Sequence, residues 1–193
     1  DNGLEIDVNG TKATVTEANF VALKDVQGKV GVGGATFGDA YTDVYFNDVV
    51  VGETKEDLNT WKLYKDNLAG QEWDPAAQYE ETVQAGRKWN TIRTGSQNGG
   101  GHSYAGATGP ARLLDKDRTI KPADVFSLSF TPINSGNFGF FYSYVNDNDF
   151  LYIGYDSSSK WYWQNGSGSY GSLNGDFETP ENGKEMTFSV TMS

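Results

Sequence analysis

The chain has 193 residues, of which 15 are Lys or Arg and 26 are Asp or Glu, so that its formal net charge is −11. Such a surface repels phosphate backbones and anionic membranes, and no run of 18 apolar residues occurs, which argues against nucleic acid as a partner and against membrane insertion. Cysteine is absent, which excludes disulfides, thiolate catalysis and zinc sites built on cysteine.

The first 51 residues predict a β-rich block. Leu4-Glu5-Ile6-Asp7-Val8 alternates apolar and polar side chains, and residues 13–15 form the second strand of a hairpin around Asn9-Gly10. Asn-Gly is the strongest short signal for such a turn, because both residues accept the positive φ of a type I′ turn. A short strand is expected at 28–32 and a longer one at 42–51.

Residues 52–193 predict an irregular segment followed by dense β-structure. Up to residue 100 the pattern is irregular, with a strand at 61–64, a turn or short helix at 74–77 and a flexible loop at 97–101. Further strands are expected at 125–130, 138–145, 150–155, 161–164 and 186–192, with residues 146–149 as a hairpin loop and a Gly/Ser stretch at 165–172. Regularly spaced short strands are typical of an all-β, two-sheet antiparallel β-sandwich, and 193 residues suffice for one such domain.

The two ends of the chain read as two halves of one hairpin. Met186–Met192 alternates as strictly as Leu4–Val8, and if the ends were joined, Asn2-Gly3 would form the tight turn. We therefore expect the opening and closing strands to be neighbours in one sheet, as in a repeat unit or a circular permutant. The pattern leaves open whether residues 1–8 pair within the chain or with a neighbouring copy.

A family resemblance appears when the chain is read as residues 52–193 followed by 1–51. Phe126-Ser127-Leu128-Ser129-Phe130 leads into three aromatic strands, and residues 28–32 and 44–51 then stand where a glycine-rich and a closing strand are expected. In this order the chain resembles a laminin-G-like, concanavalin A-type jelly roll. The resemblance implies a jelly-roll fold and a carbohydrate-binding, lectin-like or adhesive module at the outside of a cell or on a bacterial surface, present in several copies.

The resemblance also implies a structural calcium ion between the first and last strands of the family pattern. Calcium prefers six to eight oxygen ligands, which carboxylates supply. The candidate ligands are Asp43 and Asp48 on the closing strand, with Asp115 or Asp117 ahead of the strand that begins at Val125.

Aromatic residues carry the functional prediction. If Phe141, Leu151 and Ile153 point into the core, alternation leaves a set of aromatic side chains on the outer face of their sheet. This set, with an amide that could meet sugar hydroxyls, is Tyr142, Tyr144, Tyr152, Trp161, Trp163 and Gln164. Flat rings with polar tips suit pyranose rings. The alternative is that these aromatics are core residues, in which a β-sandwich is rich.

The motifs in this sequence that resemble catalytic sites lack residues that catalysis would need. Glu5-Ile6-Asp7 resembles the Glu-x-Asp strand of family-16-type glucanases, but the final glutamate of that motif is missing and Asn9 belongs to a turn. His102 is the single histidine, and no Gly-x-Ser-x-Gly surrounds the serines near it. We therefore expect a non-catalytic module whose partners are a glycan or glycoprotein and neighbouring copies. The alternative is a structural repeat of a surface fibre assembled by strand exchange, and less favoured is a glucanase-type glycosidase.

Overall fold

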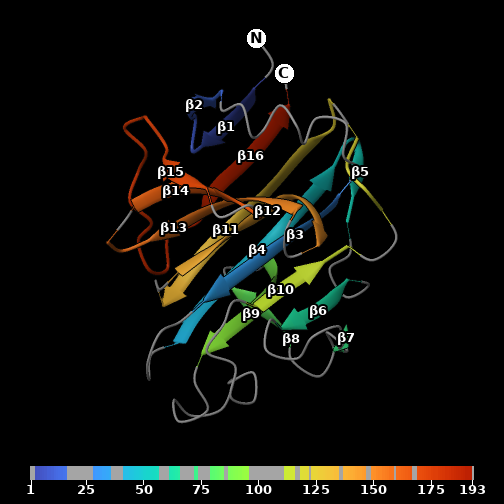
Figure 1. Ribbon diagram of the computed structural model, residues 1–193. Coiled ribbons are helices and arrows are strands. Elements are labelled where there is room, and N and C mark those ends of the chain that lie inside the picture. The colour runs from blue at the N-terminus through green and yellow to red at the C-terminus, as the bar shows by residue number, and fades with distance from the viewer. Residues whose placement is uncertain are drawn as a thin grey trace.

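A computed structural model describes residues 3–16, 28–35, 41–56, 61–65, 72–73, 79–84, 87–95, 111–115, 118–121, 123–134, 137–146, 149–158, 160–166 and 169–192. In these ranges the regular elements are strands, arranged as two antiparallel sheets packed face to face (Figure 1). The prediction of an all-β, two-sheet antiparallel sandwich is confirmed. Over the same residues, no helix has the length and apolar character needed to cross a bilayer.

Sheet A has the strand order β2-β1-β16-β11-β4-β9-β8, with β5 paired to β4. Its strands are β1 (Leu4–Val8), β2 (Thr11–Val15), β4 (Tyr41–Val51), β5 (Thr54–Lys55), β8 (Tyr79–Gln84), β9 (Arg87–Gly95), β11 (Val125–Asn134) and β16 (Met186–Met192). Sheet B has the order β15-β14-β13-β12-β3-β10-β6-β7. Its strands are β3 (Lys29–Ala35), β6 (Lys62–Lys65), β7 (Glu72–Trp73), β10 (Ala111–Leu114), β12 (Asn137–Asn146), β13 (Asp149–Asp156), β14 (Lys160–Asn165) and β15 (Tyr170–Ser172).

Residues 1–51 and 52–193 interleave in both sheets. In sheet A, β4 lies between β11 and β9, and in sheet B, β3 lies between β12 and β10. Neither segment could complete a sheet without the other, because each central strand needs hydrogen-bonded neighbours on both edges.

The first and last strands are neighbours in sheet A, as the sequence predicts. β1 pairs antiparallel with β16 of the same chain, with Leu4 opposite Met192 and Val8 opposite Phe188. The two ends of the chain accordingly emerge close together (Figure 1). The hairpin of β1 and β2 is also confirmed, since Asn9 and Gly10 at its tip have φ angles of 50° and 83°.

Strands that the sequence did not predict lie mainly between residues 72 and 114. β8 and β9 form a long hairpin, and β9 pairs with β4 on its other side. Their sequences, YEETVQ and RKWNTIRTG, lack the strict alternation of β16, so partners supplied by the tertiary structure decide their conformation. The predicted turn or helix at 74–77 and the predicted loop at 97–101 lie outside the described residues.

The core fills the space between the sheets. Sheet A contributes the faces Leu4–Ile6–Val8, Phe126–Leu128–Phe130 and Phe188–Val190, and sheet B contributes aromatic residues of β12, β13 and β14. The rings of Phe140 and Phe188 stack across the interface with centroids 4.0 Å apart. Burying each such side chain contributes about 1.5–3 kcal/mol, which makes these contacts the main source of stability.

A β-bulge in β12 changes which side chains face the core. The register of β12 shifts after Phe141 against both of its neighbours, β13 and β3. Phe138, Phe140 and Tyr142 point into the core, whereas Phe141 and Tyr144 belong to a separate cluster on the outer face. The prediction that Phe141 points inward and Tyr142 outward is therefore wrong. Phe138, Phe140 and Tyr142 keep the period of two, so this error lies in the face that the sequence assigned to the strand. The bulge acts beyond Tyr142, where it turns Tyr144 to the outer face although Tyr142 points inward.

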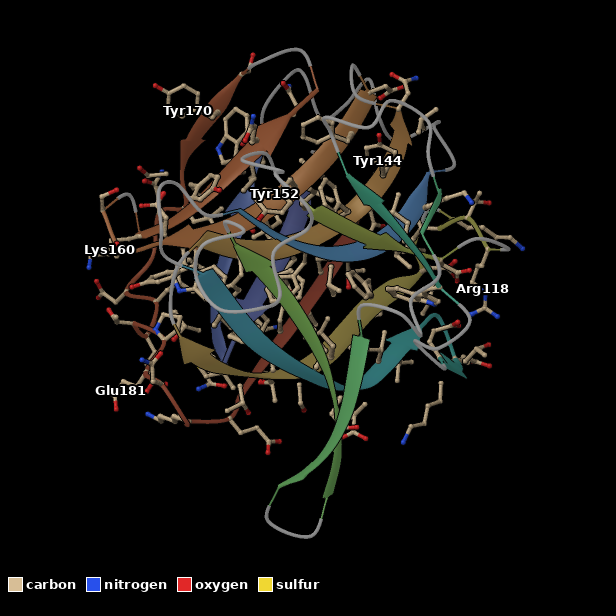
Figure 2. The ribbon with its side chains drawn as sticks, turned by 90° about the horizontal axis from the view of Figure 1, so that it is seen from below. Arg118, Tyr144, Tyr152, Lys160, Tyr170 and Glu181 are labelled. Carbon is tan, nitrogen blue, oxygen red and sulfur yellow. The ribbon has the colours of Figure 1, made fainter. Side chains whose placement is uncertain are left out.

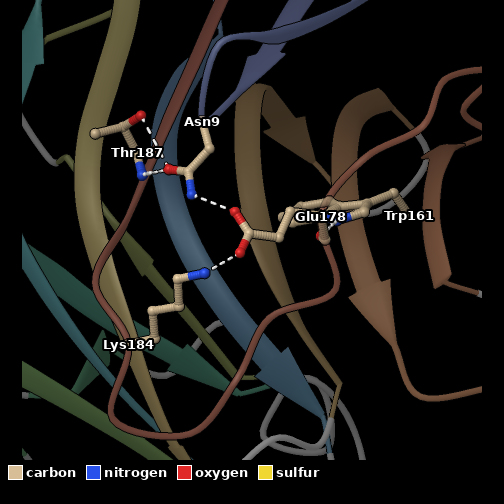
Figure 3. Close-up of polar contacts among 5 residues, drawn as sticks. All are labelled: Asn9, Trp161, Glu178, Lys184 and Thr187. Atoms are coloured by element: carbon tan, nitrogen blue, oxygen red, sulfur yellow. Dashed lines mark hydrogen bonds and ion pairs between the residues drawn. The ribbon is translucent and has the colours of Figure 1, made fainter.

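Asn9 ties the first hairpin to the start of β16 and to the segment before it. Its Oδ1 accepts a hydrogen bond from the Thr187 backbone N at 2.7 Å, and its Nδ2 donates to Glu178 Oε2 at 2.8 Å (Figure 3). Lys184 forms an ion pair with the same carboxylate. The backbone oxygen of Glu178 in turn accepts a hydrogen bond from Trp161 Nε1 at 3.0 Å. Asn9 thus connects the β1–β2 hairpin with β16, and through Glu178 it is also linked to Trp161 in β14 of sheet B.

Candidate functional site

The outer face of sheet B carries an aromatic cluster, which we call the outer cluster. It contains Leu114, Phe141, Tyr144, Phe150, Tyr152 and Tyr162, and it is separate from the core between the sheets. Strand register explains the arrangement. Phe141 of β12 lies opposite Tyr152 of β13, Tyr152 opposite Gln164 of β14, and Gln164 opposite Tyr170 of β15. A row of three aromatic rings and one amide therefore crosses four strands on one face.

The rings of the outer cluster contact one another. The centroids of Phe141 and Tyr152 are 4.8 Å apart, those of Tyr144 and Phe150 are 6.2 Å apart in a stacked pair, and those of Tyr152 and Tyr162 are 6.0 Å apart. Such pairs contribute about 0.5–1.5 kcal/mol each beyond the area they bury. The contacts hold the rings in fixed orientations, which a preformed binding surface needs.

Two glycines let the tyrosine rings lie against the sheet. A Cβ atom on Gly139 would lie 2.6 Å from Tyr152 Cζ, and one on Gly154 would lie 2.5 Å from Tyr152 Cε1 and 2.6 Å from Tyr162 Cζ. Gly139 and Gly154 are opposite each other in β12 and β13. Glycine within a strand marks such a close approach. Any larger residue at these positions would push the tyrosine rings off the sheet.

Exposure increases along the row toward the edge strand β15. Tyr152 is 8% exposed and Phe141 5%, whereas Tyr170 is 77% exposed. Tyr144, Phe150, Tyr162 and Gln164 are half-buried. Tyr144, Tyr152 and Tyr170 come from different strands and lie on the same side of the molecule (Figure 2). The site therefore has a buried base and an exposed aromatic rim.

The phenol of Tyr152 is neutral at physiological pH. Burial raises its pKa well above the ordinary value, and the nearby Tyr162 hydroxyl, to which it is hydrogen-bonded, raises it further. A neutral phenol both donates and accepts hydrogen bonds, as the hydroxyl of a sugar does.

The structure separates the six predicted sugar-binding residues into two groups. Tyr144, Tyr152 and Gln164 lie on the outer face of sheet B, in or beside the outer cluster. Tyr142, Trp161 and Trp163 point into the core and are 1%, 3% and 7% exposed. The outer face predicted for these three residues is therefore wrong.

Sequence reasoning missed Phe141, Phe150, Tyr162 and Tyr170 as residues of this face. Tyr162 alternates with Trp161 and Trp163, and the prediction of these two tryptophans on the outer face left Tyr162 unrecognised. The Gly/Ser-rich surroundings of Tyr170 hid its strand, whose available signal was one large aromatic residue among small ones.

Of the predicted calcium ligands, the two whose side chains are described belong to different sheets. Asp48 lies in β4 with its Oδ1 3.2 Å from Lys55 Nζ, and the buried Asp115 follows β10 of sheet B. Asp43 is in β4, but its side chain is outside the described part of the structure, as is all of Asp117. Among the described residues, no three acidic or histidine side chains gather as a metal site would need. Calcium therefore stays a prediction.

Asp115 instead belongs to a partly buried polar cluster with Glu56 and Arg118. Arg118 Nη1 lies 2.8 Å from Glu56 Oε1 and donates to the backbone oxygen of Val51 at 2.9 Å, while its backbone N donates to Asp115 Oδ1 at 3.1 Å. Burial raises the pKa of Glu56, the guanidinium of Arg118 opposes this shift, and the Asp115 carboxylate adds to it. These contacts fasten the end of β5 to the segment after β10.

Glu5 and Asp7 share the outer face of β1, and both make local contacts. Glu5 Oε1 lies 2.7 Å from Lys12 Nζ on the paired strand β2. Asp7 Oδ1 accepts a hydrogen bond from the Gly10 backbone N at 2.7 Å and thereby supports the Asn-Gly turn. His102 lies outside the described residues.

Comparisons with protein-family models, with curated proteins and with solved structures found no match for this chain.

Proposed function

We propose that this chain is a non-catalytic, extracellular or surface-attached carbohydrate-binding module of laminin-G-like type. The ligand, a glycan or glycoprotein, would lie across the outer face of β12, β13, β14 and β15. The observation that carries this proposal is the row that leads from buried Tyr152 through Gln164 to exposed Tyr170.

The chemistry of this row suits a neutral saccharide. The apolar C–H face of a pyranose packs on an aromatic ring, and its hydroxyls need nearby donors and acceptors. The exposed ring of Tyr170 and the half-buried ring of Tyr162 supply the aromatic surface. The amide of Gln164 supplies a hydrogen-bond donor and an acceptor. A neutral ligand also avoids repulsion by a chain whose net charge is −11.

Weak binding at one such site is sufficient if copies are linked. A millimolar contact corresponds to only about −4 kcal/mol. Linked copies raise the overall avidity through effective concentration, without any new contact.

The experiment is a glycan-array screen followed by titration calorimetry with the best sugar, both with and without a calcium chelator. Tyr170→Ala and Tyr162→Ala should each weaken binding about fivefold, because each removes one stacking contact of about 1 kcal/mol. Tyr170→Phe should retain most of the affinity, since the ring remains. Val125→Ala, at an exposed apolar residue of sheet A, is the matched control and should bind normally. Unchanged affinity in both tyrosine-to-alanine variants would refute this location of the site.

The fibre-forming alternative gains no support from the strand pairing. It assigned the contact between the opening and closing strands to neighbouring copies, but β1 pairs with β16 of its own chain.

A further inference from the structure

Asn-Gly pairs in this chain carry a reactive chemistry that the sugar-binding face does not use. In such a pair the backbone nitrogen of the glycine can attack Cγ of the preceding asparagine and close a five-membered succinimide ring. Glycine favours the attack because it has no Cβ to hinder the approach, and asparagine is for such reasons a thermolabile residue. The pairs within the described part of the chain are Asn9-Gly10, Asn165-Gly166, Asn174-Gly175 and Asn182-Gly183.

The reaction requires a glycine nitrogen that is able to turn toward Cγ. The nitrogen must also lose its proton, so an N–H that donates a hydrogen bond has to break that bond first. A reaction between two groups of one chain is fast only when the reacting atoms can reach attack geometry. The hydrogen bonds of the glycine N–H groups therefore decide which asparagine reacts.

The pair at the tip of the first hairpin is held at both reacting groups. Gly10 N donates to Asp7 Oδ1 at 2.7 Å, so a carboxylate stabilises the proton that the reaction must remove. The side-chain amide of Asn9 is bound to the Thr187 backbone N and to Glu178 Oε2 (Figure 3). Asn9 is therefore protected although it is exposed.

Two further pairs are held through the backbone. Gly183 N donates to the backbone oxygen of Pro132 at 2.7 Å, and Gly166 N donates to that of Phe150 at 3.1 Å. Asn165 is in addition only 4% exposed. Each of these glycine nitrogens must leave a bond to a distant strand before it can react.

Asn174-Gly175 differs from these three pairs. It follows the bond from Leu173 N to the Trp161 backbone oxygen, where the chain leaves β14, and both of its residues are exposed. Among the residues that the structure describes, neither the Asn174 amide nor the Gly175 N–H has a hydrogen-bond partner. No bond therefore has to open before this nitrogen turns toward Cγ.

We propose that Asn174 is a site of spontaneous modification, at which asparagine converts to aspartate and isoaspartate. The bond between Gly175 N and Asn174 Cγ forms, the Cγ–Nδ2 bond breaks, and the amide nitrogen leaves as ammonia with the proton of the Gly175 N–H. Water then opens the ring, adding its hydroxyl to one of the two carbonyl carbons and its proton to the ring nitrogen. Either product adds one negative charge, and isoaspartate also lengthens the backbone by one carbon.

The modified residue would lie between two anchored side chains. Leu173 is 7% exposed, and Phe177 packs against the core with its ring centroid 6.3 Å from that of Trp161. The ends of the reactive segment are therefore fixed, whereas Asn174 and Gly175 between them face solvent. A sample of the folded chain should accordingly accumulate more acidic forms that all carry the change at this one position.

The test follows the four asparagines within one sample of the intact chain. The folded chain is kept at body temperature and mildly alkaline pH in water enriched in heavy oxygen, and peptide mapping by mass spectrometry measures conversion over time. Asn174 should convert at least about tenfold faster than Asn9, Asn165 and Asn182, because those three pairs must first break a hydrogen bond. Heavy oxygen should enter at residue 174, since water opens the ring. Equal rates at the four positions, or faster conversion at another of them, would overturn the proposal.

The same measurement in guanidinium chloride separates the effect of structure from that of local sequence. Unfolding removes the protecting bonds, so the four rates should then agree within about threefold. If Asn174 kept its lead in the unfolded chain, the hydrogen bonds would not be the cause, and the structural assignment would be wrong.

Two variants of the folded chain locate the change by ion-exchange chromatography. Asn174→Gln should stop the appearance of acidic forms, because its side chain would have to close a larger ring. Asn182→Gln, at an exposed pair whose glycine N–H is bonded, is the matched control and should acidify at the parent rate. Acidification of Asn174→Gln at the parent rate would also refute the assignment.

Discussion

Replacing Asn9 by alanine removes two contributions to the stability of the fold, a residue that tolerates the left-handed backbone conformation and a hydrogen bond. Alanine in the left-handed conformation at φ 50° costs about 1 kcal/mol relative to asparagine. The hydrogen bond from the Thr187 backbone N, 2.7 Å long, is also lost, which adds about 1 kcal/mol. The exposed contact with Glu178 adds little, because solvent screens it. We expect Asn9→Ala to lower the free energy of unfolding by about 2 kcal/mol and the Tm by about 4–8 °C.

The measurement is urea unfolding followed by tryptophan fluorescence, with Asn9→Gly as the matched variant. Glycine accepts the same φ but lacks the side-chain oxygen, so it should lower the stability by only about 1 kcal/mol. The reasoning about backbone conformation is refuted if both variants lose the same stability. The role of the Thr187 bond is refuted if Asn9→Gly is as stable as the parent chain.

Three further predictions concern buried positions. Gly139→Ala should lower the free energy of unfolding by about 2–3 kcal/mol, because the new Cβ would lie 2.3 Å from the backbone oxygen of Ile153; an unchanged urea midpoint would show that the strands can separate. Burial raises the pKa of Tyr142 to about 12, whereas the unfolded phenol titrates near its ordinary value of about 10. Stability should therefore fall as the pH rises between these values, and Tyr142→Phe should reduce that fall in thermal melts. Burial also raises the pKa of Glu56, so the unfolded carboxyl releases its proton at a lower pH than the folded one, and stability falls as the pH rises through this range. Glu56→Gln should have a flatter Tm profile between pH 4 and 7, and profiles that coincide would contradict this account.

The strands that could be predicted are those whose sequence alternates strictly or carries a strong turn signal. β1, β2 and β16 are of this kind, and their pairing followed from the Asn-Gly turn and from the matching patterns at the two ends. The core faces of β11 and β13 followed from the same period of two. β8, β9 and β15 could not be predicted, because β8 and β9 do not alternate strictly and β15 has only three residues, one of them a glycine. The pairing of β9 with β4 also joins segments that lie far apart in the sequence.

The residues of the candidate site likewise fall into those that the sequence predicted and those that it did not. The sequence pointed to aromatic residues between 140 and 165, and Tyr144, Tyr152 and Gln164 do lie on the outer face. Tyr142, Trp161 and Trp163 were placed on that face as well, although they form part of the core. Phe141 and Tyr162 were missed, because alternation alone does not show which face of a strand points outward.

By itself, the sequence determined the class of fold, the short-range turns and the closure of one sheet by the two ends of the chain. These depend on local backbone preferences and on the two-residue period of a strand, which neighbouring residues already encode. Only the tertiary structure decided which aromatic rings are exposed and where polar side chains meet. A single bulge in β12 or β4 changes the face that residues present, and bulges arise from the register between strands that are distant in the sequence.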